Sequence, residues 1–93
     1  MITAIVSIVV EPSRIPEVAQ AVVDIEGIEQ VYSVTGDVDL IAVARVRAHE
    51  DLATVIADSL SKVDGVLDTT TNIAFKTYSK RDLDAAFDLG IDG

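Results

Sequence analysis

The sequence predicts an α+β fold of the ferredoxin-like type, a βαββαβ sandwich in which a four-stranded antiparallel sheet carries two helices on one face. Three observations support this prediction. Apolar residues alternate along four segments, as in strands, and recur at helical spacing along two others. The two halves of the chain also repeat one pattern, and each half has the order strand, helix, strand.

The first half begins with an apolar strand and continues into a helix. Residues 2–10 alternate between two faces and are rich in β-branched side chains. In residues 11–27, "EPSRIPEVAQAVVDIEG", the apolar period changes to that of a helix. We expect Ser13 to be the N-cap, Pro16 to lie in the first turn, where its missing N–H costs nothing, and Gly27 to end the helix.

The remaining elements follow in the same order. Strands are expected at about 28–35 and 38–47, joined by a hairpin turn. A second helix is expected over about 50–63, ending at Gly65, and a fourth strand over about 66–78.

An internal repeat supports this division. The segment "VAQAVVDIEGI" (18–28) aligns with "IADSLSKVDGV" (56–66) at an offset of 38 residues. The alignment pairs Gly27 with Gly65 and Ile28 with Val66. Two such units with right-handed crossovers give the predicted sandwich.

The sheet face without helices has a mixed composition. In the third strand one face carries Val38, Leu40, Ala42, Ala44 and Val46, and the other carries Asp39, Ile41, Val43, Arg45 and Arg47. A solvated antiparallel sheet would alternate more cleanly. Because 49% of the residues are hydrophobic, more than one small core can hide, we expect the second face to pack on another copy as a sheet-on-sheet dimer.

Composition limits the classes of function. The 93 residues make one domain with net charge −9, from 16 acidic and 7 basic residues, which is unsuited to binding nucleic acid directly. Without cysteine there is no disulfide, thiolate nucleophile or cysteine-based metal site. The apolar start "MITAIVSIVV" lacks a basic leader and is too short to span a membrane, so we expect a cytoplasmic protein with no membrane partner.

The C-terminal segment is expected to be separate from the domain. We expect a domain over residues 1–78 and a helical tail over 79–93, because Ser79 and Asp82 have capping-box spacing and are followed by the apolar residues Leu83, Ala86 and Phe87. A helix this short is not stable alone, so we expect it to dock on a neighbour.

Residues for catalysis are sparse. The single His49 has no second histidine or cysteine with metal-ligand spacing, and no serine has a histidine partner in a recognisable motif. Asp37 and Asp39 are better explained as turn and strand-start residues that bond backbone N–H groups than as an acid–base pair. Arg45 and Arg47 are expected to pair with acidic neighbours in a dimer, with carboxylate binding less favoured. We therefore expect no enzyme, no metal and no cofactor.

Binding of a small molecule fits the segment "SVTGDVDLIAV" (33–43) better. An α-amino acid needs acceptors for its ammonium group and N–H donors for its carboxylate. A turn at Gly36 exposes backbone N–H groups, Asp37 or Asp39 can accept from an ammonium group, and Thr35 adds a hydroxyl.

A run of threonines offers further hydroxyls. Thr69, Thr70 and Thr71 can donate or accept hydrogen bonds, although threonine is also common on edge strands for its β-propensity alone. The predicted sheet puts the second and fourth strands at opposite edges, so the turn and the threonines would meet only across an interface between subunits.

These segments resemble a known family. The pattern "VYSVTGDVDLIAVARV", preceded by "GIEQ" and followed by "KVDGV" and "TTT", resembles the effector-binding domain of the Lrp/AsnC family, called the RAM domain (regulation of amino acid metabolism). The resemblance covers about residues 2–78, and the G-D-x-D turn is its most specific part.

The resemblance implies a ferredoxin-like dimer that assembles further, commonly into an octamer of four dimers. It also implies that an amino acid binds between dimers, at the turn between the second and third strands. By position, the implied ligand-binding residues are Thr35, Gly36, Asp37 and Asp39, with Tyr32 nearby and Thr69, Thr70 and Thr71 as partners.

Regulators of this family carry an N-terminal helix-turn-helix domain, whereas this chain opens at the first strand. It is then either a stand-alone RAM protein, which Met1 favours, or a fragment. A stand-alone module would sense or buffer an amino acid, or associate with full-length regulators and so modulate transcription.

Two other functions remain open. A dimeric α/β-barrel enzyme on this fold, such as a small cofactor-independent monooxygenase or isomerase, would need a polar pocket between sheet and helices lined by His49, Tyr32 or Tyr78. The aromatic content of 4% and the single histidine argue against it. A purely structural partner, recruited through the acidic surface and the tail, is the third hypothesis.

The apolar second face leads to a prediction about assembly. Light scattering should give the mass of a dimer or a larger oligomer, because that face is too apolar to stay in water. A stable monomer at micromolar concentration would contradict the sheet-on-sheet dimer.

Overall fold

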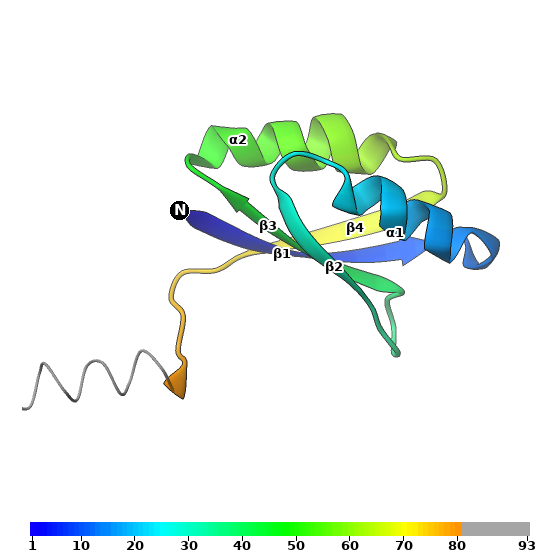
Figure 1. Ribbon diagram of the computed structural model, residues 1–93, viewed down its shortest axis with the longest axis horizontal. Coiled ribbons are helices and arrows are strands. Elements are labelled where there is room, and N and C mark those ends of the chain that lie inside the picture. The colour runs from blue at the N-terminus through cyan, green and yellow to red at the C-terminus, as the bar shows by residue number, and fades with distance from the viewer. Residues whose placement is uncertain (81–93) are drawn as a thin grey trace, which may run out of the picture.

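One antiparallel sheet organises the chain. The computed structural model describes residues 1–80. Its strands are β1 (Ile2–Val10), β2 (Ile28–Ser33), β3 (Leu40–Val46) and β4 (Val66–Ile73), in the spatial order β2-β3-β1-β4 (Figure 1). This order confirms the predicted ferredoxin-like fold, with β2 and β4 at the two edges.

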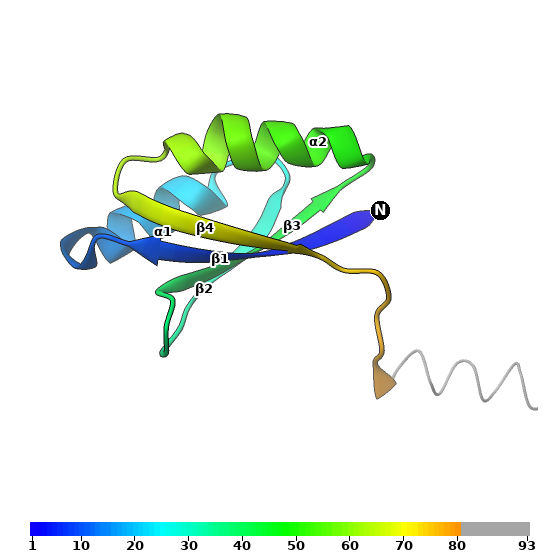
Figure 2. The same ribbon diagram turned by 180° about the vertical axis from the view of Figure 1, so that it is seen from behind.

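Two helical bodies cover one face of the sheet. The first is a 3-10 turn, η1 (Pro12–Arg14), followed by α1 (Ile15–Val23). The second begins as α2 (His49–Ala53) and continues through the π-helical η2 (Thr54–Ser59) and the 3-10 turn η3 (Leu60–Lys62). Both bodies lie on the same side of the sheet in the front and back views (Figures 1 and 2). None of the helices within residues 1–80 is long and apolar enough to cross a membrane.

The core lies between the sheet and these helices. Alternate residues of the two central strands are buried there, as the period-two pattern predicts. Val18 and Val22 of α1 and Leu52, Val55 and Leu60 of the second body pack on them. The central-strand contribution consists of Ala4, Val6, Ile8, Val10, Leu40, Ala42, Ala44 and Val46.

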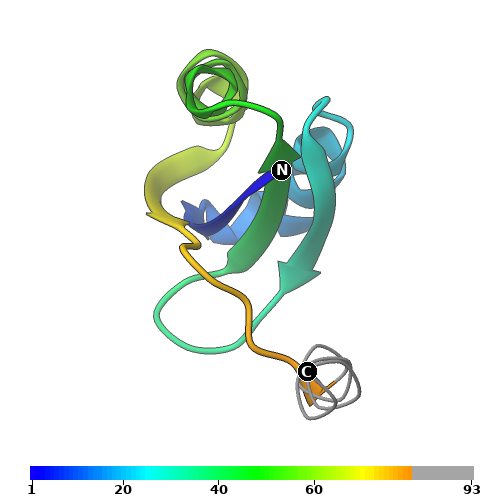
Figure 3. The same ribbon diagram turned by 90° about the vertical axis from the view of Figure 1, so that its left-hand side faces the viewer.

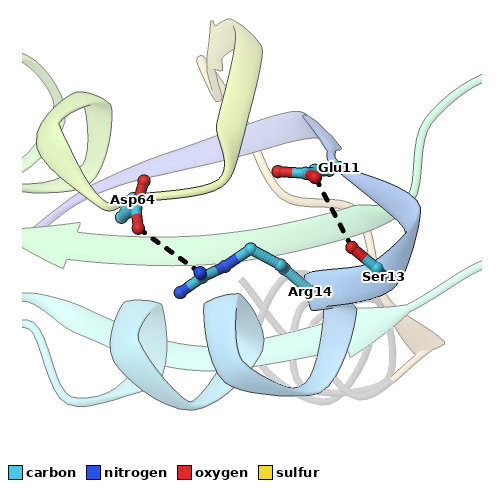
Figure 4. A network of polar contacts seen from close by, with 4 residues as sticks. All are labelled: Glu11, Ser13, Arg14 and Asp64. Atoms are coloured by element: carbon cyan, nitrogen blue, oxygen red, sulfur yellow. Dashed lines mark hydrogen bonds and ion pairs between the residues drawn. The ribbon is translucent and has the colours of Figure 1, made fainter.

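The start of α1 differs from the prediction. Ser13 does not cap the helix; it lies in η1, and its hydroxyl is 3.5 Å from a carboxylate oxygen of Glu11 (Figure 4). Pro16 does occupy the first turn, as predicted. The helix ends at Val23, before Gly27, because the N–H of Ile25 bonds the carbonyl of Val22, three residues back, instead of the carbonyl four residues back (3.1 Å).

The fourth strand is shorter than predicted. β4 ends at Ile73, and one further backbone bond joins the N–H of Ala74 to the carbonyl of Thr3 (2.9 Å). Its partner β1 begins at Ile2, so residues beyond Ala74 have no strand beside them. Phe75 is therefore fully exposed although it belongs to an alternating pattern. The predicted tail 79–93 lies outside the described residues except for its first two positions.

Gly27 and Gly65 occupy equivalent places in the two halves. Both have positive φ, +100° and +99° respectively, and both precede a strand. A Cβ at Gly27 would lie 2.7 Å from Cγ2 of Val55, and one at Gly65 would lie 2.8 Å from Cγ2 of Val18. Each glycine thus lets its connection pass close over the helix of the other half.

Replacing these glycines tests that packing. Gly36→Ala should lower the free energy of unfolding by about 1 kcal/mol, since φ is +117° but the surrounding space is open. Gly65→Ala should cost about 1–3 kcal/mol more, because its Cβ also collides with Val18. Urea denaturation at equal protein concentration measures both, and equal losses would show that the contact with Val18 carries no cost.

Candidate functional site

The hairpin between β2 and β3 is an open loop of residues 34–39 rather than a tight turn. It is closed by a bond from the N–H of Val34 to the carbonyl of Asp39 (3.0 Å). Thr35, Gly36 and Asp37 at its tip are all exposed. No heavy atom lies within 4 Å of a Cβ built on Gly36, so the backbone there is open to a ligand or a neighbouring molecule.

Asp39 anchors this loop to the central strand. Its N–H donates to the carbonyl of Ile8 (3.0 Å), and its Oδ2 accepts from the N–H of Val10 (2.8 Å). The carboxylate thus satisfies a donor of β1 beyond the last β1–β3 pair, Ile8 with Leu40. One oxygen of Asp39 has a structural role, which agrees with the sequence interpretation of a strand-start aspartate.

Tyr32 lies on the sheet face away from the helices, here called the open face. It is 50% exposed, and its hydroxyl accepts from the side-chain amide of Gln30. Opposed pairs place Tyr32, Ile41, Ser7 and Thr70 in one row across all four strands.

The three threonines do not share a face. Thr70 faces the open side with Ser7, whereas Thr69 and Thr71 pair with Ile8 and Val6 and face the helix side. Tyr32 and Thr70 lie three strand spacings apart, about 14 Å. A small ligand cannot touch both edges of one chain, so the structure separates the predicted residues of β2 and β4.

The open face is partly apolar, as predicted. Ile5, Ile41 and Val43 are neighbours in the central strands and keep part of their surface in solvent. Arg45 has an acidic neighbour in its own chain, since its Nε lies 3.6 Å from an oxygen of Glu29, and its pairing across a dimer stays a prediction. The remaining surface of this face is a candidate interface between copies.

Sequence reasoning missed a hollow at the opposite end of β3 from the hairpin. Its volume is about 640 Å³, and its lining includes Ile25, Glu26, Val46, Arg47, Thr54 and Val55. Figure 3 looks at the end of the molecule that holds it. In the sequence, this end of the molecule was marked only by the internal repeat, which aligns Gly27 with Gly65.

The residues named for an enzyme belong to three different parts of the fold. His49 begins α2, Tyr32 lies on the open face, and Tyr78 follows the end of β4. None of them lines the hollow between the sheet and the helices. Within residues 1–80 no group of three or more His, Cys, Asp or Glu side chains could hold a metal ion.

The fold and the hairpin match a known family. A family model described as the Lrp/AsnC ligand binding domain matches residues 3–83. The chain belongs to the Lrp/AsnC family. The match covers the sheet, both helical bodies and the G-D-x-D loop, in agreement with the resemblance drawn from the sequence.

Individual relatives agree with this assignment. The Bacillus subtilis (strain 168) protein named uncharacterized HTH-type transcriptional regulator YugG is 35% identical over 80 residues, which cover 83% of this chain and 48% of that protein. The chain thus spans about half the length of the curated relatives it matches.

Solved structures give the same fold. TTHA0845 from Thermus thermophilus is 35% identical, with a TM-score of 0.81, over 86% of this chain and 100% of that one. A feast or famine regulatory protein of M. tuberculosis, solved in complex with L-methionine, is 26% identical with a TM-score of 0.70, over 87% of this chain and 55% of that one.

The two hairpin aspartates should differ in their effect on stability. Asp39→Ala removes the acceptor for the N–H of Val10 and should lower the free energy of unfolding by about 1.5–3 kcal/mol. Asp37→Ala, at the exposed tip, should change it by less than about 0.5 kcal/mol. Chemical denaturation distinguishes them, and similar values for both would contradict an anchoring role for Asp39.

Proposed function

We propose that this chain is a non-enzymatic effector-binding and oligomerisation module that binds a free amino acid or a related small metabolite at the hairpin between β2 and β3. The observation that carries the proposal is this hairpin itself, an exposed loop with an open backbone at Gly36 and a carboxylate at Asp37, in an Lrp/AsnC ligand-binding domain.

The chemistry of the loop suits an amphoteric ligand. Backbone N–H groups near Gly36 can donate to a carboxylate, and the Asp37 carboxylate can accept from an ammonium group. Asp39 holds the loop in place through Val10 and keeps its second oxygen for the ligand. Thr35 adds a hydroxyl at the exposed tip.

A single chain offers only part of the site. The loop tip is exposed, and Tyr32 is about 14 Å from Thr70 across the sheet. We propose that sheet-on-sheet dimers assemble further, up to an octamer of four dimers, and that a neighbouring copy covers the loop and contributes threonines of β4. The partly exposed Ile5, Ile41 and Val43 support the first of these contacts.

The names of the relatives support a regulatory role. Curated relatives are named transcriptional regulators and are about twice as long as the matched region. We propose that this module acts in the cytoplasm, either by sensing an amino acid itself or by assembling with full-length regulators through the same interfaces and so modulating transcription. An enzymatic function has no comparable support, because none of His49, Tyr32 and Tyr78 lines the hollow.

Calorimetric titration with the twenty amino acids tests the hairpin, and L-methionine is the first choice because a relative was solved with it. Asp37→Asn should weaken binding at least about tenfold, since one charge-assisted hydrogen bond is lost. Asp58→Asn, which removes the same charge from an exposed position on the second helical body, should bind as the unchanged protein does. No heat and no thermal shift with any amino acid would overturn the proposal.

A further inference from the structure

The hollow at the far end of β3 lies away from the hairpin. β3 runs from Leu40 to Val46, so its two ends are about 20 Å apart. The hollow has apolar walls at Ile25, Val46 and Val55 and polar groups at its edges. Its volume of about 640 Å³ lies within the range of small-molecule sites, roughly 300–1,000 Å³.

The internal repeat shows what occupies the equivalent place in the other half. There the side chain of Arg14 fills the space beside Gly65, since a Cβ on that glycine would lie 3.3 Å from Nε of Arg14. The guanidinium group then reaches the carboxylate of Asp64 at 3.4 Å (Figure 4). Arg14 of the first half thus neutralises Asp64 of the second half, the residue that precedes Gly65.

The same position beside Gly27 lacks that cation. At the repeat offset, Asp64 corresponds to Glu26 and Arg14 corresponds to Leu52. Leu52 is 6% exposed and packs in the core, so it brings no charge to Glu26. Glu26 has no ion pair within residues 1–80, and the hollow opens beside it. Beside Gly27 the atoms nearest a built Cβ belong to Val55 and Val46 (2.7 and 3.5 Å), so apolar side chains take the place that Arg14 has in the other half, and the hollow borders on them.

Arg47 supplies the opposite charge at the same hollow. It lines the hollow, is exposed, and forms no ion pair with any described residue. Of the other charged groups there, Arg45 is paired with Glu29, the carboxylate of Asp51 accepts from the N–H of Ala48 (3.2 Å), and Met1 adds the N-terminal amino group to the lining. Glu26 and Arg47 are thus the charged side chains at the hollow to which the described residues supply no partner.

We propose that this hollow is a second binding site, for a free α-amino acid, separate from the hairpin. The ammonium group of the ligand pairs with Glu26, as the guanidinium group of Arg14 pairs with Asp64 in the other half. Its carboxylate pairs with Arg47, and its side chain lies against Ile25, Val46 and Val55. The hydroxyl of Thr54 is available to either charged group. The two sites lie at opposite ends of β3, so one domain would bind two ligands.

Backbone-amide NMR of the whole chain tests this site and the hairpin separately, through the amides of Gly27 and Gly36. L-Methionine should shift the Gly27 resonance in a saturable manner. L-Methioninamide, which lacks the carboxylate, and N-acetyl-L-methionine, which lacks the ammonium group, should each bind there at least about tenfold more weakly, since each loses one charged pair.

Variants assign the two charges. Glu26→Gln and Arg47→Gln should each weaken the response at Gly27 at least about tenfold and leave that at Gly36 unchanged. Lys62→Gln, which removes a charge from an exposed turn away from the hollow, should change neither response. Because all three side chains are exposed, none of these variants should disturb folding.

Three results would overturn the second site. The first is that none of the twenty amino acids shifts the Gly27 resonance. The second is that L-methionine and both analogues shift it equally. The third is that Glu26→Gln and Arg47→Gln leave its response to L-methionine unchanged. A response at Gly36 with none at Gly27 would overturn the second site and leave the hairpin proposal standing. A response at Gly27 with none at Gly36 would support the second site and count against the hairpin.

Discussion

The central strand β1 is the element on which the rest of the structure depends. It pairs with β3 on one side and β4 on the other, and its side chains Ala4, Val6, Ile8 and Val10 lie under both helical bodies. Burial of each valine or isoleucine contributes roughly 1.5–3 kcal/mol. Because β1 pairs with both β3 and β4, its two ends also limit how far these neighbours can remain paired in the sheet.

Both ends of β1 shape the surface of the molecule. At the Val10 end, the strand continues past its last pair with β3, and the carboxylate of Asp39 satisfies the N–H that would otherwise be left unpaired. At the Ile2 end, the strand stops, and the chain after Ala74 leaves the sheet. The candidate ligand loop is therefore held by the same backbone that organises the core.

The two halves of the chain have the same topology but different chemistry at their ends. Gly27 and Gly65 both bring a connection close over the opposite helix. Val18 and Arg14 lie beside Gly65, whereas Val55 and Val46 lie beside Gly27, next to the hollow. The internal repeat keeps the fold symmetric, while the side chains around the two glycines differ, with an ion pair near one and a hollow beside the other.

The sequence by itself determined the class of fold, the order of the elements and most of the core, because those depend on local periods of two and 3.6 residues that are visible along the chain. It also pointed to the loop around Gly36. It did not determine that Asp39 would bond Val10, that Thr70 would face away from Thr69 and Thr71, or that Arg14 would lie beside Gly65 while a hollow lies beside Gly27. Those features depend on strand register and on contacts between residues far apart in sequence, and only the packed tertiary structure decides them.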